Sequence, residues 1–514
     1  MDRRQFLGFS AVSAFLTACG GGSAGSKIAS SSVVEVPPAP TVVSKLSAEQ
    51  WQGLSEQLNG ELILPTNVVD YSQERLVFHT RFDHIYPQAV AKCRTTDDVI
   101  AVLSFVKQHD LHIVPRSGRH GYAGYSTTEG VVLDVSQLNS ISIDDGYATI
   151  GAGARLVNIY DQLTNQSVCI PAGTCLSVGI AGLTLGGGFS VIGRAHGLTC
   201  DVLESAQIVT AQGELLTCNN NENSDLFWAL RGGGGGNFGI VTSFVFRTHK
   251  TQDINVFEAS FSFNDFEQLM SKWQVLAQSW PDEMWAQCLP NWINGSVRVT
   301  VRAFCLNQAD EARSYWEQFI AAVHTSPLSN NESTESYRDI MLGNCVNNIP
   351  SCHLSVQSAG GRMQRSAFGA SSDFFEGIIP PSGIKTLKGF IEKSINEGKY
   401  GMIIFNLLGG AIKHTEVTET AYPHRRANIS AEYYAPINIS STNEQIDETQ
   451  KWQNQFREIM APWSTGGAYV NYMDPLILDW QQAYYAGNYY QLQKIKSKYD
   501  PEEMFNFTQS VELA

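Results

Sequence analysis

Two glycine-rich turns are the sequence feature that most constrains the fold of this chain. The first is Arg116-Ser117-Gly118-Arg119-His120-Gly121-Tyr122, and the second runs from Gly173 through Cys175 to Gly179. Glycine allows backbone N–H groups to approach an anion such as a phosphate closely. An imidazole and a thiol in the same turns could bond covalently to a ligand held there. The pattern therefore predicts an α/β-like region that binds a phosphate-bearing ligand through both turns.

The pattern of apolar and polar residues changes near residue 250. Residues 46–250 alternate short apolar strands with helical segments, one of which begins near Thr96. After residue 250 the chain has long amphipathic stretches such as 266–277 and 311–323. Between these two stretches lies a predicted strand with one solvent-exposed face. We therefore expect two domains of α+β class, the second with an antiparallel sheet covered by helices, because about 470 residues exceed what one hydrophobic core usually supports.

Three strings of residues carry a resemblance to a known family. They are the first turn, the segment from Cys175 to Gly187 with its regularly placed glycines, and Tyr469-Val470-Asn471-Tyr472 near the C-terminus. Together they resemble the berberine bridge enzyme-like oxidases of the vanillyl-alcohol oxidase and p-cresol methylhydroxylase superfamily. The resemblance implies a two-part PCMH-type FAD-binding domain over residues 46–250, closed by a C-terminal segment over 464–514. A separate α+β substrate domain would span residues 251–463.

The resemblance also implies the cofactor and its contacts. FAD would be bicovalently attached, with His120 on the flavin 8α-methyl carbon and Cys175 on carbon 6; attachment through His120 alone is the alternative. Arg119 stands where the family has glycine, which bears on the left-handed geometry of the turn. Val178 occupies a position that helps to gate oxygen access in plant members. The expected FAD contacts are Arg116, Ser117, Gly118, Arg119, His120, Gly121, Tyr122, Gly173, Cys175, Ser177, Val178, Gly179, Gly182, Gly186, Gly187, Ile240 and Asn471.

An alcohol must lose its hydroxyl proton as hydride leaves for flavin N5, so the site needs a base. By resemblance to carbohydrate-oxidising members, Tyr469 is the expected base, although aromatic packing is its alternative role. Free tyrosine titrates near pKa ~10, so Tyr469 would need help from a neighbour. Those members can place a carboxylate where this chain has Asn406. Asn cannot take the proton, so Glu432, on a predicted strand, is the candidate for the catalytic carboxylate that would assist Tyr469.

The N-terminus reads as an export signal. Arg3 and Arg4 form a twin-arginine pattern, and the apolar stretch that follows is too short to span a bilayer. It ends at Cys19 in what looks like a lipoprotein cleavage box, with an ordinary signal peptide as the alternative. We therefore expect a signal over residues 1–19, a flexible tether over 20–45 and a lipid on Cys19. The protein would be exported to the periplasm or attached to the outer membrane of a bacterium.

Composition excludes some other functions. The net charge is −15 and no basic run lies outside the signal, so nucleic acid is not an expected partner. No C-x-x-C pair is present, so we expect no structural zinc or other metal site. Export makes disulfides chemically possible, and Cys345 and Cys352 are close enough in sequence for a local bridge.

These observations give three hypotheses of function. The first is an FAD-dependent oxidase that takes hydride from an alcohol carbon, with a carbohydrate as the leading substrate and O2 reduced to H2O2. The second is an FAD-linked dehydrogenase of a secondary metabolite or aromatic alcohol that uses a quinone or cytochrome acceptor. The third is a non-catalytic flavin-containing binding module.

Overall fold

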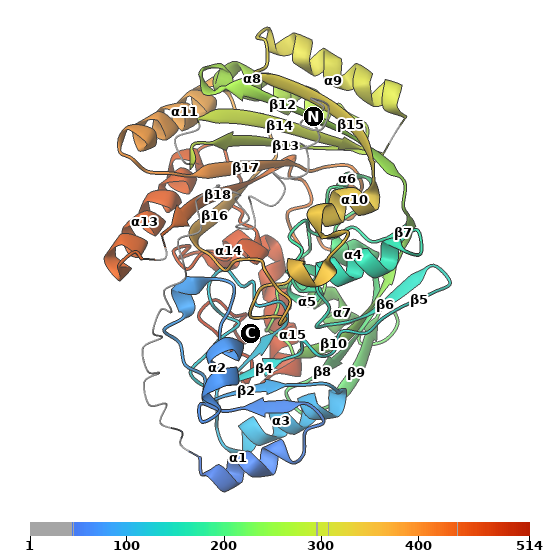
Figure 1. Cartoon of the computed structure of the whole chain (residues 1–514), viewed down its shortest axis with the longest axis vertical. Helices are drawn as coiled ribbons and strands as arrows, with labels where there is room; N and C mark the ends of the chain where they lie inside the picture. The colour runs from blue at the N-terminus through green and yellow to red at the C-terminus, as the bar shows by residue number, and fades with distance from the viewer. Residues whose placement is uncertain (1–43, 45, 294–296, 307, 439) are drawn as a thin grey trace, which may run out of the picture.

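The computed structural model describes residue 44 and residues 46–293, 297–306, 308–438 and 440–514. Figure 1 shows two smaller sheets in the lower part of the molecule and one large sheet with its helices in the upper part. The export signal, Cys19 and all of the tether except residue 44 lie outside the described residues. Within the described part, no helix is both long and apolar enough to cross a membrane.

The first lower sheet has the strand order β1-β2-β4-β3, and β2, β4 and β3 run parallel. Helix α3 begins where Thr95 and Asp98 form a capping box, one residue before the Thr96 cap that the sequence suggests. The elements are α1 (Ala48–Ser55), β1 (Glu61–Ile63), α2 (Val68–Glu74), β2 (Ala89–Lys92), α3 (Thr96–Gln108), β3 (Ile113–Arg116) and β4 (Val131–Asp134).

The second lower sheet is antiparallel, with the order β5-β6-β10-β8-β9. Gly213, at φ 80°, lies in the hairpin turn between β8 and β9. The elements are β5 (Ile141–Asp144), β6 (Tyr147–Gly151), α4 (Leu156–Thr164), β7 (Val168–Cys169), α5 (Ile180–Leu185), α6 (Gly193–His196), β8 (Leu203–Val209), β9 (Leu215–Asn219), α7 (Ser224–Ala229), β10 (Ile240–Arg247) and β11 (His249–Lys250), the last pairing with β7.

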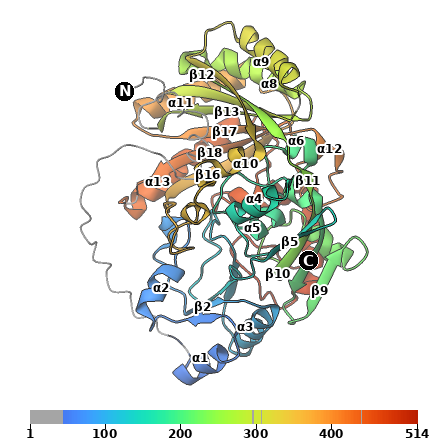
Figure 2. The ribbon, with the colours of Figure 1, turned by 45° about the vertical axis from the view of Figure 1, so that its right-hand side comes forward.

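The upper part is one seven-stranded antiparallel sheet in the order β15-β12-β14-β13-β17-β18-β16, covered on its outer face by α8, α9, α11 and α13 (Figure 2). This confirms the predicted α+β class. The elements are β12 (Asp253–Ser262), α8 (Phe266–Gln278), β13 (Met284–Asn291), β14 (Arg298–Cys305), α9 (Ala309–Val323), β15 (Ser329–Ser336), α10 (Tyr337–Leu342), β16 (Ala367–Phe375), α11 (Pro381–Asn396), β17 (Met402–Leu407), α12 (Ala411–His414), β18 (Ile429–Ile437) and α13 (Asn443–Met460).

Alternation along the strands gives the large sheet two different faces. Ala286, Phe405 and Tyr433 belong to the hydrophobic core between the sheet and its helices. Successive side chains of a strand point to opposite faces, so their neighbours Asn406 and Glu432 point toward the lower part. The sheet therefore presents an apolar face to its helices and a partly polar face to the rest of the molecule.

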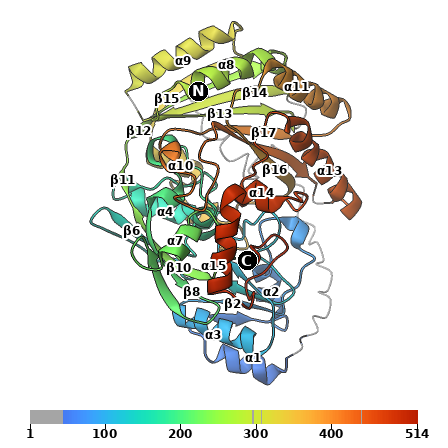
Figure 3. The same cartoon turned by 180° about the vertical axis from the view of Figure 1, so that it is seen from behind.

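The C-terminal segment returns to the lower part, where α14 (Trp480–Tyr485) and α15 (Tyr489–Tyr499) lie beside it (Figure 3). The buried Lys496 ammonium donates hydrogen bonds to the Asp500 carboxylate and to the backbone carbonyl of Asn237, in the glycine-rich segment before β10. The fold thus uses the end of the chain to complete a domain that begins near its start. Short 3₁₀ turns occur at Thr80–Phe82, Thr199–Val202, Phe263–Asp265, Gly343–Cys345, Ile349–Cys352, Val470–Tyr472 and Ala486–Asn488.

Candidate active site

The two glycine-rich turns lie against each other. A Cβ atom on Gly118 would lie 2.0 Å from the backbone nitrogen of Gly179, so a side chain has no room where the turns meet. Nε2 of His120 lies 2.8 Å from Oγ of Ser177, within hydrogen-bond distance, which joins the turns a second time. Residues that are 57 positions apart in sequence therefore form one structural unit.

A cavity of about 360 Å³ extends from these turns toward the large sheet. Its walls come from the two turns, from strands of the upper sheet, and from Gly235 and Gly236 in the run of five glycines at 232–236, called the glycine run below. Gly186 and Gly187, two expected contacts, do not line it, and Ser177 reaches it only through His120. The expected residues that do line it are Arg116, Ser117, Gly118, Arg119, His120, Gly121, Tyr122, Gly173, Cys175, Val178, Gly179, Gly182, Ile240, Glu432, Tyr469 and Asn471.

His120 is held as a neutral imidazole. Its ring stacks on Phe78 with the ring centroids 4.2 Å apart. Burial, together with the positive charge of nearby Arg155, lowers the pKa of His120 to about 3. The contact with Ser177 engages Nε2, so Nδ1 is the ring nitrogen left for a bond to a ligand. An uncharged imidazole with a free ring nitrogen is the form that can act as a nucleophile.

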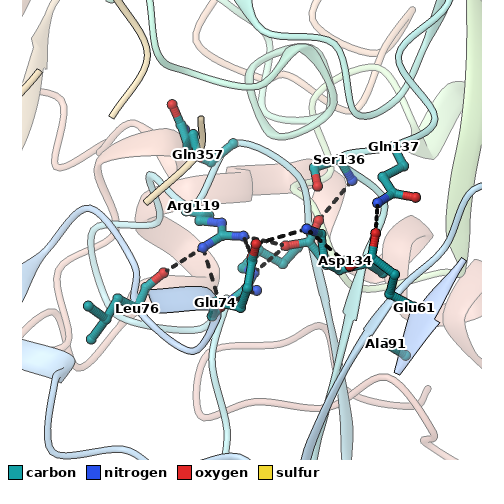
Figure 4. A network of polar contacts seen from close by, with 12 residues as sticks. Glu61, Glu74, Leu76, Ala91, Arg119, Asp134, Ser136, Gln137 and Gln357 are labelled. Carbon is teal, nitrogen blue, oxygen red and sulfur yellow. Dashed lines mark hydrogen bonds and ion pairs between the residues drawn. The ribbon is translucent and has the colours of Figure 1, made fainter. Parts of the chain in front are cut away.

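Arg119 lies in the left-handed region at φ 67°, the conformation that glycine adopts without strain. Its buried guanidinium forms ion pairs with Glu74 and with Asp134, and Arg116 pairs with the same Asp134 at 2.8 Å (Figure 4). The Phe78 N–H also donates to the Arg119 carbonyl. These contacts hold the strained residue in place, so the turn keeps its geometry without the second glycine.

Glu432 lies on β18 in the roof of the cavity, where it is 5% exposed. The Tyr122 hydroxyl donates to its carboxylate at 2.9 Å, and the Tyr472 hydroxyl donates to it as well. The two phenol rings stack on each other, with centroids 5.2 Å apart. Burial raises the pKa of Glu432 to about 7, because the described structure places no cation against it to offset the loss of solvation.

Beside Glu432, the roof carries a pair of amides and an aromatic side chain. The Gln287 amide donates to Oδ1 of Asn406 at 2.8 Å, and the Asn406 amide lies 3.3 Å from the Ser430 hydroxyl. Trp285 and Phe368 also line the cavity. This part of the wall can therefore both stack on a flat ligand surface and offer hydrogen bonds to hydroxyl groups.

Tyr469 also lines the cavity, but its hydroxyl has different partners. The Gly188 N–H and the Asn471 amide both donate to the Tyr469 oxygen at 2.9 Å. Burial raises the pKa of Tyr469, and its ring stacks on Phe189. The expected role of Tyr469 as a base stays a prediction, and the geometry joins the carboxylate to Tyr122 and Tyr472 instead.

Sequence reasoning missed Tyr472, which is three residues after Tyr469 in the same quoted string. A 3₁₀ turn at Val470–Tyr472 separates the two rings, so that only Tyr472 reaches Glu432. It also missed the acidic partners of the first turn, Glu74 and Asp134. Asp134 ends a fully buried strand, and an acid at such a place is a usable sign of a nearby buried cation.

The cavity fits FAD. Glycines at the meeting of the turns and at the glycine run leave backbone exposed to a ligand, as a dinucleotide requires, and His120 and Cys175 both line the same space. The residues of both turns would hold FAD, which would supply the hydride acceptor of the reaction. Among the described residues, no group of three or more His, Cys, Asp or Glu side chains could hold a metal ion.

Comparisons with known proteins agree with this geometry. Residues 87–219 match the FAD binding domain family, and residues 468–512 match the family described as berberine and berberine like. The chain is 30% identical over 449 residues to the FAD-linked oxidoreductase YgaK of Bacillus subtilis, covering 86% of this chain and 94% of the relative.

Solved structures share the fold. BBE-like 1 from Physcomitrella patens matches with a TM-score of 0.82 and 27% identity, over 90% of this chain and 99% of that protein. Xylooligosaccharide oxidase from Myceliophthora thermophila C1, solved with xylobiose, matches with a TM-score of 0.78 and 24% identity, over 91% of this chain and 99% of that one. The chain belongs to the berberine bridge enzyme-like family and is an FAD-linked oxidoreductase.

Proposed function

We propose that this protein is an oxidase that removes hydride and a proton from the CH–OH group of a carbohydrate, with Glu432 as the base. The observation that carries the proposal is a buried carboxylate in the cavity wall that is held by the hydroxyl groups of two tyrosines. Bound FAD would supply the hydride acceptor. We thus propose Glu432 as the base in place of Tyr469. Tyr469 would instead donate a hydrogen bond to the flavin or pack against it.

The surroundings of Glu432 suit proton abstraction. A base is most effective when its pKa is near the working pH, and burial brings the pKa of Glu432 to about 7. Tyr122 and Tyr472 donate to the carboxylate and so fix the direction in which its other lone pairs point. The same carboxylate can accept the hydroxyl proton of a substrate that lies below it.

A carbohydrate is the leading substrate class because the roof combines Trp285 with the Gln287–Asn406 amide pair. An aromatic ring can stack on a sugar face while the amides bond its hydroxyls. The xylobiose-bound structural neighbour supports this choice at the level of fold. Phe78, Phe368 and Ile404 make the remaining wall apolar, which favours an aromatic alcohol as the second candidate.

The substrate class can be tested under anaerobic conditions. Purified protein is mixed with oligosaccharides of different sugars and, separately, with aromatic alcohols, and the flavin absorbance near its visible maximum is followed. We expect oligosaccharides to bleach the flavin and aromatic alcohols to leave it oxidised. Bleaching by aromatic alcohols alone would replace the first candidate by the second.

Oxygen is the proposed acceptor, on the strength of Val178, which lines the cavity at the position that plant relatives use as a gate. The test is stopped-flow mixing of the reduced protein with oxygenated buffer. We expect fast reoxidation in the wild type and slower reoxidation in Val178→Leu, because the larger side chain narrows the approach. Slow reoxidation of the wild type would favour a dehydrogenase with a quinone or cytochrome acceptor.

We also propose attachment of FAD through both His120 and Cys175. After acid precipitation the yellow colour should remain in the pellet for wild type and for the single variants His120→Ala and Cys175→Ala. Only the double variant should release it. Free flavin above a wild-type pellet would contradict covalent attachment but leave the fold assignment in place.

Export and a lipid on Cys19 complete the proposal, and they rest on the N-terminal sequence alone. Expression of the full chain in a Gram-negative host with radiolabelled palmitate tests them. The expected result is a labelled band in the membrane fraction that disappears in Cys19→Ser, and labelling that persists in this variant would exclude Cys19 as the acylated residue.

A further inference from the structure

A segment of the upper part crosses over to cover the two glycine-rich turns. It lies between α10 and β16, and a disulfide between Cys345 and Cys352, with a Cα–Cα distance of 6.0 Å, closes its first portion. This is the local bridge that the sequence suggested. Immediately after it, Nε2 of His353 lies 2.9 Å from Oδ1 of Asn158 on α4. The segment is thus tied both to itself and to the lower part.

Gln357 in this segment contacts both turns with one side-chain amide. Its Nε2 group donates to the carbonyl of Gly118 at 2.8 Å and to the carbonyl of Ser177 at 3.0 Å. Its Oε1 atom accepts from the Leu354 N–H at 2.9 Å, which fixes the orientation of the amide. Both protons of the amide and its oxygen are therefore used, and the side chain has little freedom to turn.

The carbonyls of Gly118 and Ser177 each lie close in sequence to one of the two residues proposed to bond the flavin. Gly118 is two residues before His120, and Ser177 is two residues after Cys175. One rigid amide that bonds both carbonyls adds to the His120–Ser177 bond and the Gly118–Gly179 packing, and together these contacts set how far apart the His120 and Cys175 side chains lie. The His120 turn has further support from the ion pairs of Arg119 and from Phe78.

We propose that Gln357 is a positioning residue that holds the two turns at the separation at which His120 and Cys175 can both bond one ring system. This inference rests on the proposed double attachment. The Cys175 turn is supported as well, because the Leu156 and Val157 N–H groups donate to the carbonyls of Val178 and Leu176. Loss of the amide should therefore change the distance between the turns without unfolding either, and fewer chains should carry both linkages.

Gln357→Glu tests the inference with almost no change of shape. The glutamate keeps an oxygen for the Leu354 N–H but turns an acceptor toward the two carbonyls. Gln357→Lys restores donors to those carbonyls, and Gln364→Glu is the matched control. Gln364 is an exposed residue of the same segment, and its amide contacts only the nearby Arg362 carbonyl. Intact-protein mass and peptide mapping give the fraction of chains attached through each residue.

We expect the ratio of doubly to singly attached chains to fall about 25-fold in Gln357→Glu, since two hydrogen bonds are lost and each is worth about a factor of five. Gln357→Lys should recover most of the double attachment, and Gln364→Glu should match wild type. Equal double attachment in Gln357→Glu and wild type would overturn the inference alone. Wild-type protein without covalent flavin would overturn the attachment proposal and this inference together.

Discussion

Two buried carboxylates, one behind the cavity wall and one in it, have opposite shifts of their pKa. Asp134 lies below the first turn between Arg116 and Arg119, and these cations and the Ser136 N–H hold its pKa well below the usual range. Glu432 lies in the roof with two neutral phenols, and burial raises its pKa to about 7. The two side chains are 0% and 5% exposed, so depth alone does not explain the difference.

Because their pKa values differ, the two carboxylates have different roles in one site, structural for Asp134 and chemical for Glu432. A carboxylate between two guanidinium groups stays ionised at any pH at which the protein is folded, so it can only hold the turn. A carboxylate among phenols gains and loses a proton near neutral pH, so it can take part in a reaction. The partners of a buried acid, more than its burial, decide which task it performs.

The largest effect on stability is expected from Asp134→Asn. The substitution leaves Arg116 with an uncompensated buried charge and removes one of the two partners of Arg119, which should lower the free energy of unfolding by about 3–5 kcal/mol. Chemical denaturation at pH 7 measures this. The loss should persist at pH 5, because Asp134 would still be ionised in the wild type there. A loss below 1 kcal/mol would show that the network is not what holds the turn.

Glu432→Gln should leave the fold intact and remove the base. The rate of flavin reduction by any substrate that bleaches the wild type should fall about 10²–10³-fold, as is typical for loss of a general base. Anaerobic stopped-flow at pH 8 measures it. Tyr469→Phe is the companion variant and should cost far less. The reverse ranking of the two variants would return the role of base to Tyr469.

The reduction rate should depend on pH through Glu432. A base acts in its ionised form, so with a pKa near 7 the rate should rise about tenfold per pH unit below pH 7 and level off above it. The rate at pH 5 should then be about a hundredfold below the plateau. In Glu432→Gln the rise of the reduction rate with pH should disappear. A rise that remains in the variant would come from the ionisation of another group.

Glu432→Gln should also stabilise the fold at high pH, so its effect on the free energy of unfolding is opposite in sign to that of Asp134→Asn. The folded state binds the Glu432 proton more tightly than the unfolded state, so ionisation opposes folding as the pH rises from about 4.5 to 7. At pH 8, Glu432→Gln should therefore raise the free energy of unfolding by about 1–2 kcal/mol, and at pH 4 by almost nothing. Denaturation curves at the two pH values give the comparison, and a destabilised variant at pH 8 would contradict it.

The smallest expected effect on stability is at Arg119, the residue with left-handed backbone geometry in the first turn. Arg119→Gly and Arg119→Ala both remove the ion pairs to Glu74 and Asp134, but only alanine keeps the strain at φ 67°. The alanine variant should be less stable than the glycine variant by about 1 kcal/mol. Paired thermal or chemical unfolding resolves a difference of this size, and equal stabilities would mean that the turn changes its backbone.

Much of this arrangement could be predicted from local sequence. The helix at Thr96–Gln108 and the hairpin at Gly213 depend on contacts within a few residues. Strand β15 (Ser329–Ser336) was not predicted, because it is polar throughout and forms the exposed edge of the large sheet. Its strand conformation comes from pairing with β12 and not from an apolar pattern.

The active-site partnerships were harder to predict for a different reason. Tyr122 and Glu432 are 310 positions apart, and no local pattern in either segment points to the other. Gln357 lies in a segment with neither a helical nor a strand period, so its importance comes only from the carbonyls it contacts. Residue types that suit the chemistry can be read from one segment, but their pairing depends on the tertiary fold.

The closure of the lower domain by the last part of the chain sets an order of events in biogenesis. Asn471 lies so close to Gly186 that a Cβ atom there would be 2.2 Å from its amide oxygen, and Lys496 bonds the carbonyl of Asn237. While a ribosome still holds these residues, the nucleotide chamber lacks one wall. Flavin loading should therefore follow folding of this segment, and a chain truncated ahead of Tyr469, which would lose Tyr469 and Asn471 from the cavity wall, should remain colourless.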